Sequence, residues 1–188
     1  YLQPDVHGNS EGAYLITSLY YDSPDYRGYW GKIEGEKFRR KVRLRTYGKQ
    51  SVLPDTDCFL EIKERQNKTL AKRRVQLAYQ EGADLAKLGE SAQMGVGDSD
   101  MGKQAVLDEV SYLYQMRQLQ PACIVRYNRL ALNGGPAYPD LRVTFDTELR
   151  GRVHDLSLLS TGYADDAYFL PPELCIMEIK ASHSVPYW

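Results

Sequence analysis

The sequence has few cysteines and few histidines, the residues that build most zinc sites. Its 188 residues include three of each: Cys58, Cys123, Cys175, His7, His154 and His183. The cysteines are odd in number, lie far apart and form no CxxC pair, so the sequence argues against a zinc site. Each cysteine adjoins apolar, strand-like residues. We therefore expect three buried free thiols and a location in the reducing cytoplasm.

Long hydrophobic runs are also missing. No stretch approaches the roughly 18 consecutive apolar residues that a membrane helix needs, and no signal peptide is recognisable. With 43% hydrophobic and 26% charged residues, the composition is that of a globular protein. The length suits one domain with a sizeable core. Because the chain begins at Tyr1 without a Met and ends at Trp188, we expect a single domain over 1–188 that is truncated at both ends.

The formal net charge is only −1, but the charges are unevenly distributed. Residues 32–74 contain 14 Lys and Arg against six Asp and Glu, whereas the remainder contains 10 against 19. A basic block this dense predicts an anionic partner.

Alternating polar and apolar residues, separated by turn signals, predict a chain made mostly of strands. The expected strands are 13–23, 37–48, 58–65, 70–79, 122–132, 141–149 and 174–182. Helical spacing in 80–120 predicts a helical insertion, with a mobile loop over its Gly- and Ser-rich part. "SPDYRGYW" predicts a short helix with Ser23 as its cap. The expected fold class is α+β, mainly β: an antiparallel β-barrel with helices packed outside.

Two copies of Glu-Ile-Lys, in "FLEIK" and "IMEIK", show how these strands would face. Side chains alternate along a strand, so Glu61 and Lys63 lie opposite Ile62, and Glu178 and Lys180 lie opposite Ile179. Six strands repeat the pattern. Their polar faces carry Lys41, Arg43, Arg45, Lys72, Arg74, Tyr127, Arg129 and Arg142, with Thr144, Asp146 and Glu148.

Such a face has two interpretations. On an open, wet sheet the charges are simply solvated, which is common in antiparallel sheets. Two cations two residues apart on one strand lie roughly 6.7 Å from each other and repel by about 2.5 kcal/mol at an effective dielectric of 20. Around a barrel interior such repulsions would accumulate unless an anion lay between the cations. We therefore hypothesise a basic, water-filled tunnel that holds a cation and a chain of phosphates.

The order of "SLYYDSPD", "KVRLRTYG", "FLEIK", "KRRV", "RYNRLAL", "LRVTFDTEL", "IMEIK" and "VPYW" resembles that of the VTC domain. This is the polyphosphate-polymerase domain of the vacuolar transporter chaperone family. The resemblance covers nearly the whole chain and is weakest at 80–120. It implies a triphosphate tunnel metalloenzyme (CYTH-like) fold with a basic lumen and transfer of the γ-phosphate of ATP onto polyphosphate. The family's first tunnel strand and C-terminal helix have no counterpart in the sequence.

The resemblance also implies roles for individual residues. Those expected to act in catalysis are Arg43, Arg45, Lys63, Arg129 and Arg142. Those expected to bind phosphate are Lys41, Lys72, Arg74, Tyr127 and Lys180. Glu178 matches the family's metal-binding carboxylate and would hold a divalent cation, Mn²⁺ or Mg²⁺. The implied partners are ATP and inorganic polyphosphate.

Other functions stay open on the sequence alone. The same fold could hydrolyse tripolyphosphate or nucleoside triphosphates, or bind polyphosphate or inositol polyphosphate without catalysis. Nucleic-acid binding is disfavoured because "KVRLRTYG" has no aromatic residue on its basic face. "GDSDMGKQ" at 97–104 fits GxxxxGK, but Gln104 stands where a phosphate loop needs Ser or Thr, and no buried strand precedes it.

Overall fold

A computed structural model describes residues 2–5, 12–85, 101–159 and 166–182. The strands in these residues are β1 (Gln3–Pro4), β2 (Ala13–Asp22), β3 (Phe38–Tyr47), β4 (Asp57–Gln66), β5 (Thr69–Ala78), β6 (Gln120–Gly134), β7 (Tyr138–Arg152), β8 (Ala167–Tyr168) and β9 (Ile176–Lys180). The helices are α1 (Arg27–Ile33), α2 (Tyr79–Leu85) and α3 (Met101–Arg117).

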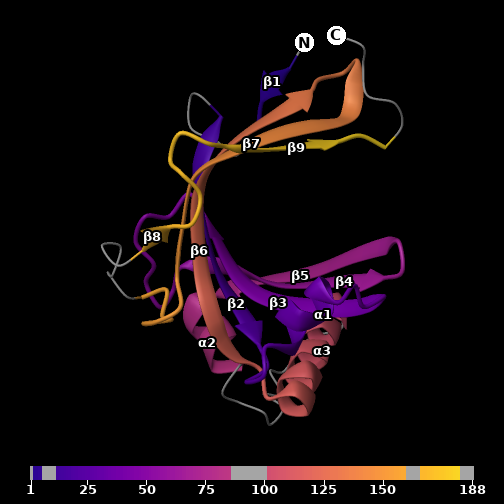
Figure 1. Ribbon diagram of the computed structural model, residues 1–188, viewed down its shortest axis with the longest axis vertical. Coiled ribbons are helices and arrows are strands. Elements are labelled where there is room, and N and C mark those ends of the chain that lie inside the picture. Colours follow the sequence, from indigo (N-terminus) through magenta and orange to yellow (C-terminus); the bar gives the residue numbers. More distant parts are fainter. Residues whose placement is uncertain (1, 6–11, 86–100, 160–165, 183–188) are drawn as a thin grey trace.

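All nine strands belong to one antiparallel sheet, which confirms the mainly β class. The strand order is β5-β4-β3-β2-β6-β7-β8, with β1 beside β6 and β9 beside β7. Figure 1 shows a strongly bent sheet, in which the arm of β7 and β9 and the arm of β3, β4 and β5 face each other across the concave side. Strand twist and three irregularities in the pairing of β6 favour such a bend. The irregularities lie at Tyr20/Tyr21 of β2 and at Arg126/Asn128 and Asn133/Gly134 of β6.

The predicted closure into a barrel is not confirmed. Within the described ranges, β5 forms one edge of the sheet and β8 and β9 form the other, and no pairing joins the two edges. Closure depends on hydrogen bonds between strands that are remote in sequence, which local alternation does not reveal. The sheet is therefore open and curved.

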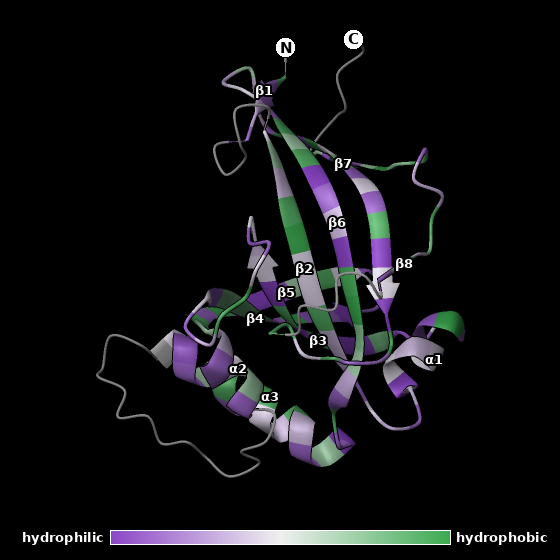
Figure 2. Cartoon of the chain, turned by 90° about the vertical axis from the view of Figure 1, so that its left-hand side faces the viewer, coloured by the Kyte–Doolittle hydropathy of each residue, from purple (hydrophilic) through white to green (hydrophobic). Residues whose placement is uncertain are grey.

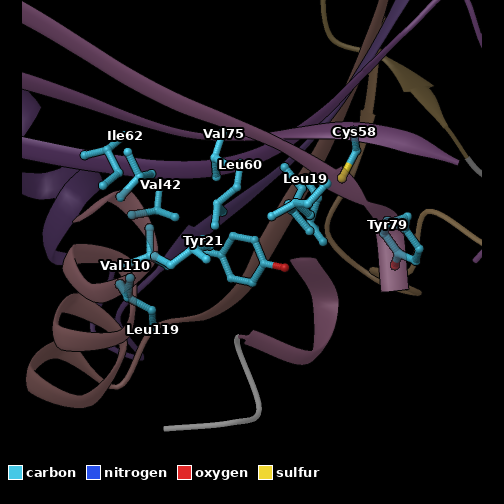
Figure 3. Packing of buried hydrophobic residues seen from close by; sticks show 14 of the residues in the cluster. Leu19, Tyr21, Val42, Cys58, Leu60, Ile62, Val75, Tyr79, Val110 and Leu119 are labelled. Atoms are coloured by element: carbon cyan, nitrogen blue, oxygen red, sulfur yellow. The ribbon is translucent and has the colours of Figure 1, made fainter. Parts of the chain in front are cut away.

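The main core lies between the convex face of β2–β5 and the helices α2 and α3 (Figures 1 and 3). Leu44, Leu60 and Ile62 are at most 1% exposed. They take alternate positions on β3 and β4, so one face of each strand is apolar. They meet Val110 and Leu113 from one side of α3. The opposite face of the same strands carries charged residues, since Lys41 pairs with Lys63 and Arg43 with Glu61. Figure 2 shows hydrophilic and hydrophobic residues alternating along the strands.

Ion pairs hold α3 against the sheet as well. Arg73 of β5 donates two hydrogen bonds to Glu109 of α3, at 2.8 and 2.7 Å. Arg40 of β3 donates to Glu64 of β4 at 2.7 Å, and its Nε lies 3.5 Å from Glu109. The cations on the convex side are therefore paired with carboxylates of the same layer.

The observed elements follow the expected ones closely. The interval 80–120 contains most of α2 and all of α3, and residues 86–100, where the mobile loop is predicted, lie outside the described residues. The short helix α1 starts at Arg27, and its N-cap is Tyr26 in the left-handed conformation, so the prediction of Ser23 as the cap is wrong. Ser23 Oγ still accepts from the backbone N–H of Arg27 at 3.0 Å. The carboxylate of Asp22 accepts from the N–H groups of Gly28 and Tyr29 at 2.8 and 3.0 Å.

The three cysteines are free thiols, but they differ in exposure. Cys58 is buried, Cys123 is half-buried and Cys175 is exposed. Burial raises the pKa of Cys58 to about 12. The prediction of three buried thiols is wrong for Cys175, because it precedes β9, which has no covering layer among the described residues.

No helix in the described part of the chain combines the length and the apolar character needed to span a membrane.

Candidate functional site: the basic concave face

Strand pairing brings the predicted site residues to one face of the sheet. Directly opposed residues of an antiparallel pair share a face. Arg45 pairs with Ser18, Tyr14 pairs with Arg129, and Thr144 pairs with Glu178. Following these registers across the sheet places all the predicted residues opposite the helix-covered core: Lys41, Arg43, Arg45, Lys63, Lys72, Arg74, Tyr127, Arg129, Arg142, Glu178 and Lys180. We call this surface the basic concave face.

Three lysines form a row across neighbouring strands. Lys41 of β3 is opposite Lys63 of β4, which is opposite Lys72 of β5. Directly opposed residues have Cβ atoms about 5 Å apart, and like charges in that position destabilise the sheet. Burial, reinforced by the charge of Lys32, lowers the pKa of Lys41. A bound anion would relieve this repulsion, so the lysine row is a suitable site for a polyanion.

The next row places a carboxylate between two arginines. Glu61 is opposite Arg43 and Arg74 and is only 1% exposed. Arg43 donates to its Oε2 at 2.6 Å, and Lys72 Nζ lies 2.5 Å from its Oε1. Burial would raise the pKa of Glu61, but Arg43 and Lys72 outweigh it and hold the pKa below its usual value. Glu61 is therefore ionised and fixes two cations in the face.

Arg45 connects the two arms of the sheet. It is 5% exposed, donates to Ser18 Oγ at 2.9 Å, and its Nη2 lies 3.4 Å from the hydroxyl of Tyr127. Arg129, the next residue on that face of β6, lies over the ring of Tyr127 at 5.3 Å. Burial, against the influence of Arg45 and Arg129, raises the pKa of the Tyr127 hydroxyl. The hydroxyl stays neutral and can donate a hydrogen bond to an anion.

On the second arm, Arg129 and Asp146 form a two-point ion pair. Nε and Nη2 of Arg129 each donate to one carboxylate oxygen of Asp146 at 2.7 Å. Burial alone would lower the pKa of Arg129, but the bonds and charge of Asp146 raise it instead. The guanidinium is permanently charged and held in one orientation, as phosphate recognition requires.

The remaining predicted residues lie farther along the β7 and β9 arm. Arg142 Nη2 lies 2.6 Å from Asp5 and 3.3 Å from the hydroxyl of Tyr14. Lys180 is opposite Arg142, and Glu178 is 3.4 Å from Lys180. The side chains of Glu178 and Lys180 are 49% and 60% exposed. They share the face with the arginines but lie at its open edge, away from the lysine row.

The described residues contain no group of three Asp, Glu, His or Cys that would enclose a metal ion. Glu61 and Asp146 are each engaged by cations. Glu178 is the predicted metal ligand, and its exposed carboxylate faces the concave side next to Thr144. Mg²⁺ in nucleotide sites is commonly held by one or two carboxylates together with waters and phosphate oxygens. Glu178 fits an ion that arrives bound to phosphate, not an ion enclosed by protein ligands.

The sequence interpretation missed several partners of these cations. Asp5, Tyr14, Tyr20 and Ser18 all contact the predicted arginines. Tyr14, Ser18 and Tyr20 alternate along the predicted strand 13–23, so their common face could have been recognised. No sequence pattern predicts the contact of Asp5, because β1, the strand that precedes it, has only two residues and shows no alternation.

Glu148 corrects the predicted face of β7. Alternation puts it beside Thr144 and Asp146, but its φ is +52°, and the β6–β7 register shifts near it. Its carboxylate accepts from Asn128, which alternates with Tyr127 and so belongs to the convex side. The extra residue of this bulge returns Leu149 to the concave side, where it packs against Tyr127. An apolar patch thus separates the cations of the two arms.

A pocket of about 660 Å³ lies at the α1 end of the concave face. Its charged lining includes Lys41, Arg43, Lys63 and Glu61. Its aromatic lining comes from β2 and from α1 and the residue before it: Tyr20, Tyr21, Tyr26, Tyr29 and Trp30. The volume lies in the range of sites for small organic ligands.

Comparison with known proteins gives one family. The model of the VTC domain matches residues 1–188, the full length of the chain. No curated protein matches the chain significantly.

Proposed function

The chain belongs to the VTC domain family, and we propose that it is a polyphosphate-polymerase domain that transfers the γ-phosphate of ATP to a growing polyphosphate chain. The observation that carries this proposal is the shared face of the lysine row and the arginines Arg43, Arg45 and Arg129. A long polyanion needs cations spread along its path, and the basic concave face offers them on both arms of the sheet.

Phosphoryl transfer depends mainly on positioning and on stabilising charge on the phosphate oxygens. Arg43 and Arg129 are suited to this because carboxylates hold their guanidinium groups in fixed orientations. A guanidinium has five N–H donors, and the bonds to these carboxylates use only some of them. Arg45 and the neutral hydroxyl of Tyr127 supply further donors between the two arms.

The lysine row would bind the polyphosphate or triphosphate oxygens without demanding one geometry, since an ammonium acts as a point charge. Such binding permits a chain to shift by one phosphate after each addition. The terminal phosphate of the chain is itself the nucleophile, so no serine, cysteine or histidine base is required. A divalent cation, when bound to the phosphates and Glu178, would neutralise charge on the triphosphate. The free thiols and the use of ATP fit a cytoplasmic location.

The test is an assay of the chain with γ-labelled ATP and Mn²⁺, with products separated by length on a gel. We expect long polyphosphate from the unmodified chain. Arg43→Ala should lower its synthesis by about a hundredfold or more, because a donor to developing charge is lost. This variant is preferable to Arg129→Ala, since Glu61 keeps Lys72 as a partner, whereas Asp146 would lose both bonds from Arg129.

Arg117→Ala on α3 is the matched control, because α3 packs on the convex side. It should synthesise polyphosphate at nearly the unmodified rate. Near-normal synthesis by Arg43→Ala would refute the assignment. Release of inorganic phosphate without polymer would instead identify a hydrolase, and binding of polyphosphate without turnover would identify a binding module.

A further inference from the structure

Three aromatic side chains on α1 and the residue before it lie outside the hydrophobic core. Tyr26, Tyr29 and Trp30 are 51%, 53% and 51% exposed. The rings of Tyr29 and Trp30 meet edge to face, with centroids 5.1 Å apart. All three line the pocket at the end of the concave face. We call them the aromatic rim.

The aromatic rim is held in a fixed position. The carboxylate of Asp22 accepts from the backbone N–H groups of Ser23, Gly28 and Tyr29, at 2.8 to 3.0 Å. A Cβ at Gly28 would lie 2.9 Å from Asp22 Oδ1, so the glycine permits this close approach. These contacts tie α1 to the end of β2. The aromatic side chains are therefore presented by a tethered segment, which lowers the entropy cost of ligand binding.

A second part of the pocket lining is cationic. Lys41, Lys63 and Arg43 form it, and they belong to the first two rows of the basic concave face. The two carboxylates in the lining are already engaged: Glu61 by Arg43 and Lys72, and Asp22 by the backbone of α1. The cations thus dominate the charge presented to a ligand.

A ligand that uses both parts of the lining must join a flat aromatic part to a chain of anionic groups. Inorganic polyphosphate has no such part, whereas a nucleoside triphosphate has both. We propose that the aromatic rim is the base-binding subsite for the nucleotide, and that the triphosphate extends from it over the lysine row towards Arg43. This inference rests on the proposed function and adds the direction in which ATP enters the site.

The test compares two ligands that cannot be turned over: adenylyl imidodiphosphate, which carries a base, and diimidotriphosphate, which does not. Stacking on one aromatic side chain is worth about 1–3 kcal/mol per base, so Trp30→Ala should weaken binding of the nucleotide analogue by about fivefold or more. Its affinity for diimidotriphosphate should stay within about twofold. Retained binding of the second ligand also shows that the variant is folded.

Tyr112→Ala is the matched control, since Tyr112 is 55% exposed on α3 and does not line the pocket. It should change neither affinity. A second measurement uses Trp188→Phe, which leaves Trp30 as the sole tryptophan of the sequence. The nucleotide analogue should quench its fluorescence and diimidotriphosphate should not.

Equal effects of Trp30→Ala on both ligands, or no effect on either, would overturn the base-binding subsite while leaving the proposed function in place. Failure of the unmodified chain to bind either ligand would overturn both proposals.

Discussion

At the scale of residues, the basic concave face depends on the few carboxylates within it. Glu61 is buried between Arg43 and Lys72, and Asp146 pairs with Arg129. Each carboxylate fixes the geometry of cations that would otherwise repel one another. These two carboxylates do not neutralise the whole lysine row, which keeps an excess of positive charge. The face can therefore bind an anion.

The pairing of Glu61 makes stability depend on pH. Its folded-state pKa is held below the ordinary value of 4.5, so its contribution is present above about pH 4.5 and is lost as the pH falls through the folded pKa. Glu61→Gln should be destabilised at pH 7 by about 2 kcal/mol, the order of charge-assisted hydrogen bonds. The difference from the unmodified chain should shrink towards pH 3. Urea unfolding at both pH values measures it.

A control for this prediction is Glu178→Gln, because Glu178 is half exposed and pairs only loosely with Lys180. Its unfolding free energy should match that of the unmodified chain at both pH values. A pH-independent deficit in Glu61→Gln would show that the lost stability comes from packing and not from charge.

At the scale of elements, the two Glu-Ile-Lys strands differ in what covers their apolar face. Ile62 is 0% exposed beneath the helices, whereas Ile179 is 46% exposed. The sequence predicted the same outward packing for both. Alternation predicts which residues share a face because it is a local property of the backbone. It does not predict whether a second layer covers that face, which depends on elements elsewhere in the chain.

The two isoleucines make a matched pair. Ile62→Ala should cost about 2–5 kcal/mol of unfolding free energy, since it removes a buried side chain from the main core. Ile179→Ala should cost less than about 1 kcal/mol, as expected for a half-exposed strand position. Chemical unfolding of both variants checks this, and equal losses would mean that β9 is covered in solution.

The same reasoning explains which site residues the sequence could predict. Alternation alone predicts the faces of residues that lie on regular stretches of strand: Arg43, Arg45, Lys63, Lys72 and Arg129. The predicted face of Glu148 is wrong because this residue has a positive φ, which reverses the alternation of side chains along β7. Asp5 lies just after β1 and Tyr20 lies on β2. Their contacts with the arginines depend on which segments pair and in which register, which no local pattern encodes.

At the scale of the whole molecule, no strand pairing within the described ranges closes the sheet over the basic concave face. The bend brings the arm of β7 and β9 and the arm of β3, β4 and β5 to face each other (Figure 1). The contact between Arg45 of β3 and the hydroxyl of Tyr127 of β6 joins the two arms. A phosphate chain bound to both arms would link them, and by mass action a ligand at a hundred times its dissociation constant would add about 2.7 kcal/mol of stability.

The central claim is that the lysine row and its neighbours bind a phosphate chain, and isothermal titration with diimidotriphosphate tests it most directly. The triple variant Lys41→Gln, Lys63→Gln, Lys72→Gln removes the lysine row. The control, Lys37→Gln, Lys49→Gln, Lys68→Gln, removes the same charge from the same basic block, at exposed positions outside the strands.

We predict that the first variant loses more than about tenfold in affinity, since each lost charge-assisted hydrogen bond costs on the order of 1.5–3 kcal/mol. The control should change by less than about threefold. Equal weakening in both variants would mean that binding follows net charge alone, and unchanged binding in the first would mean that the phosphates lie elsewhere. Either result would contradict the account.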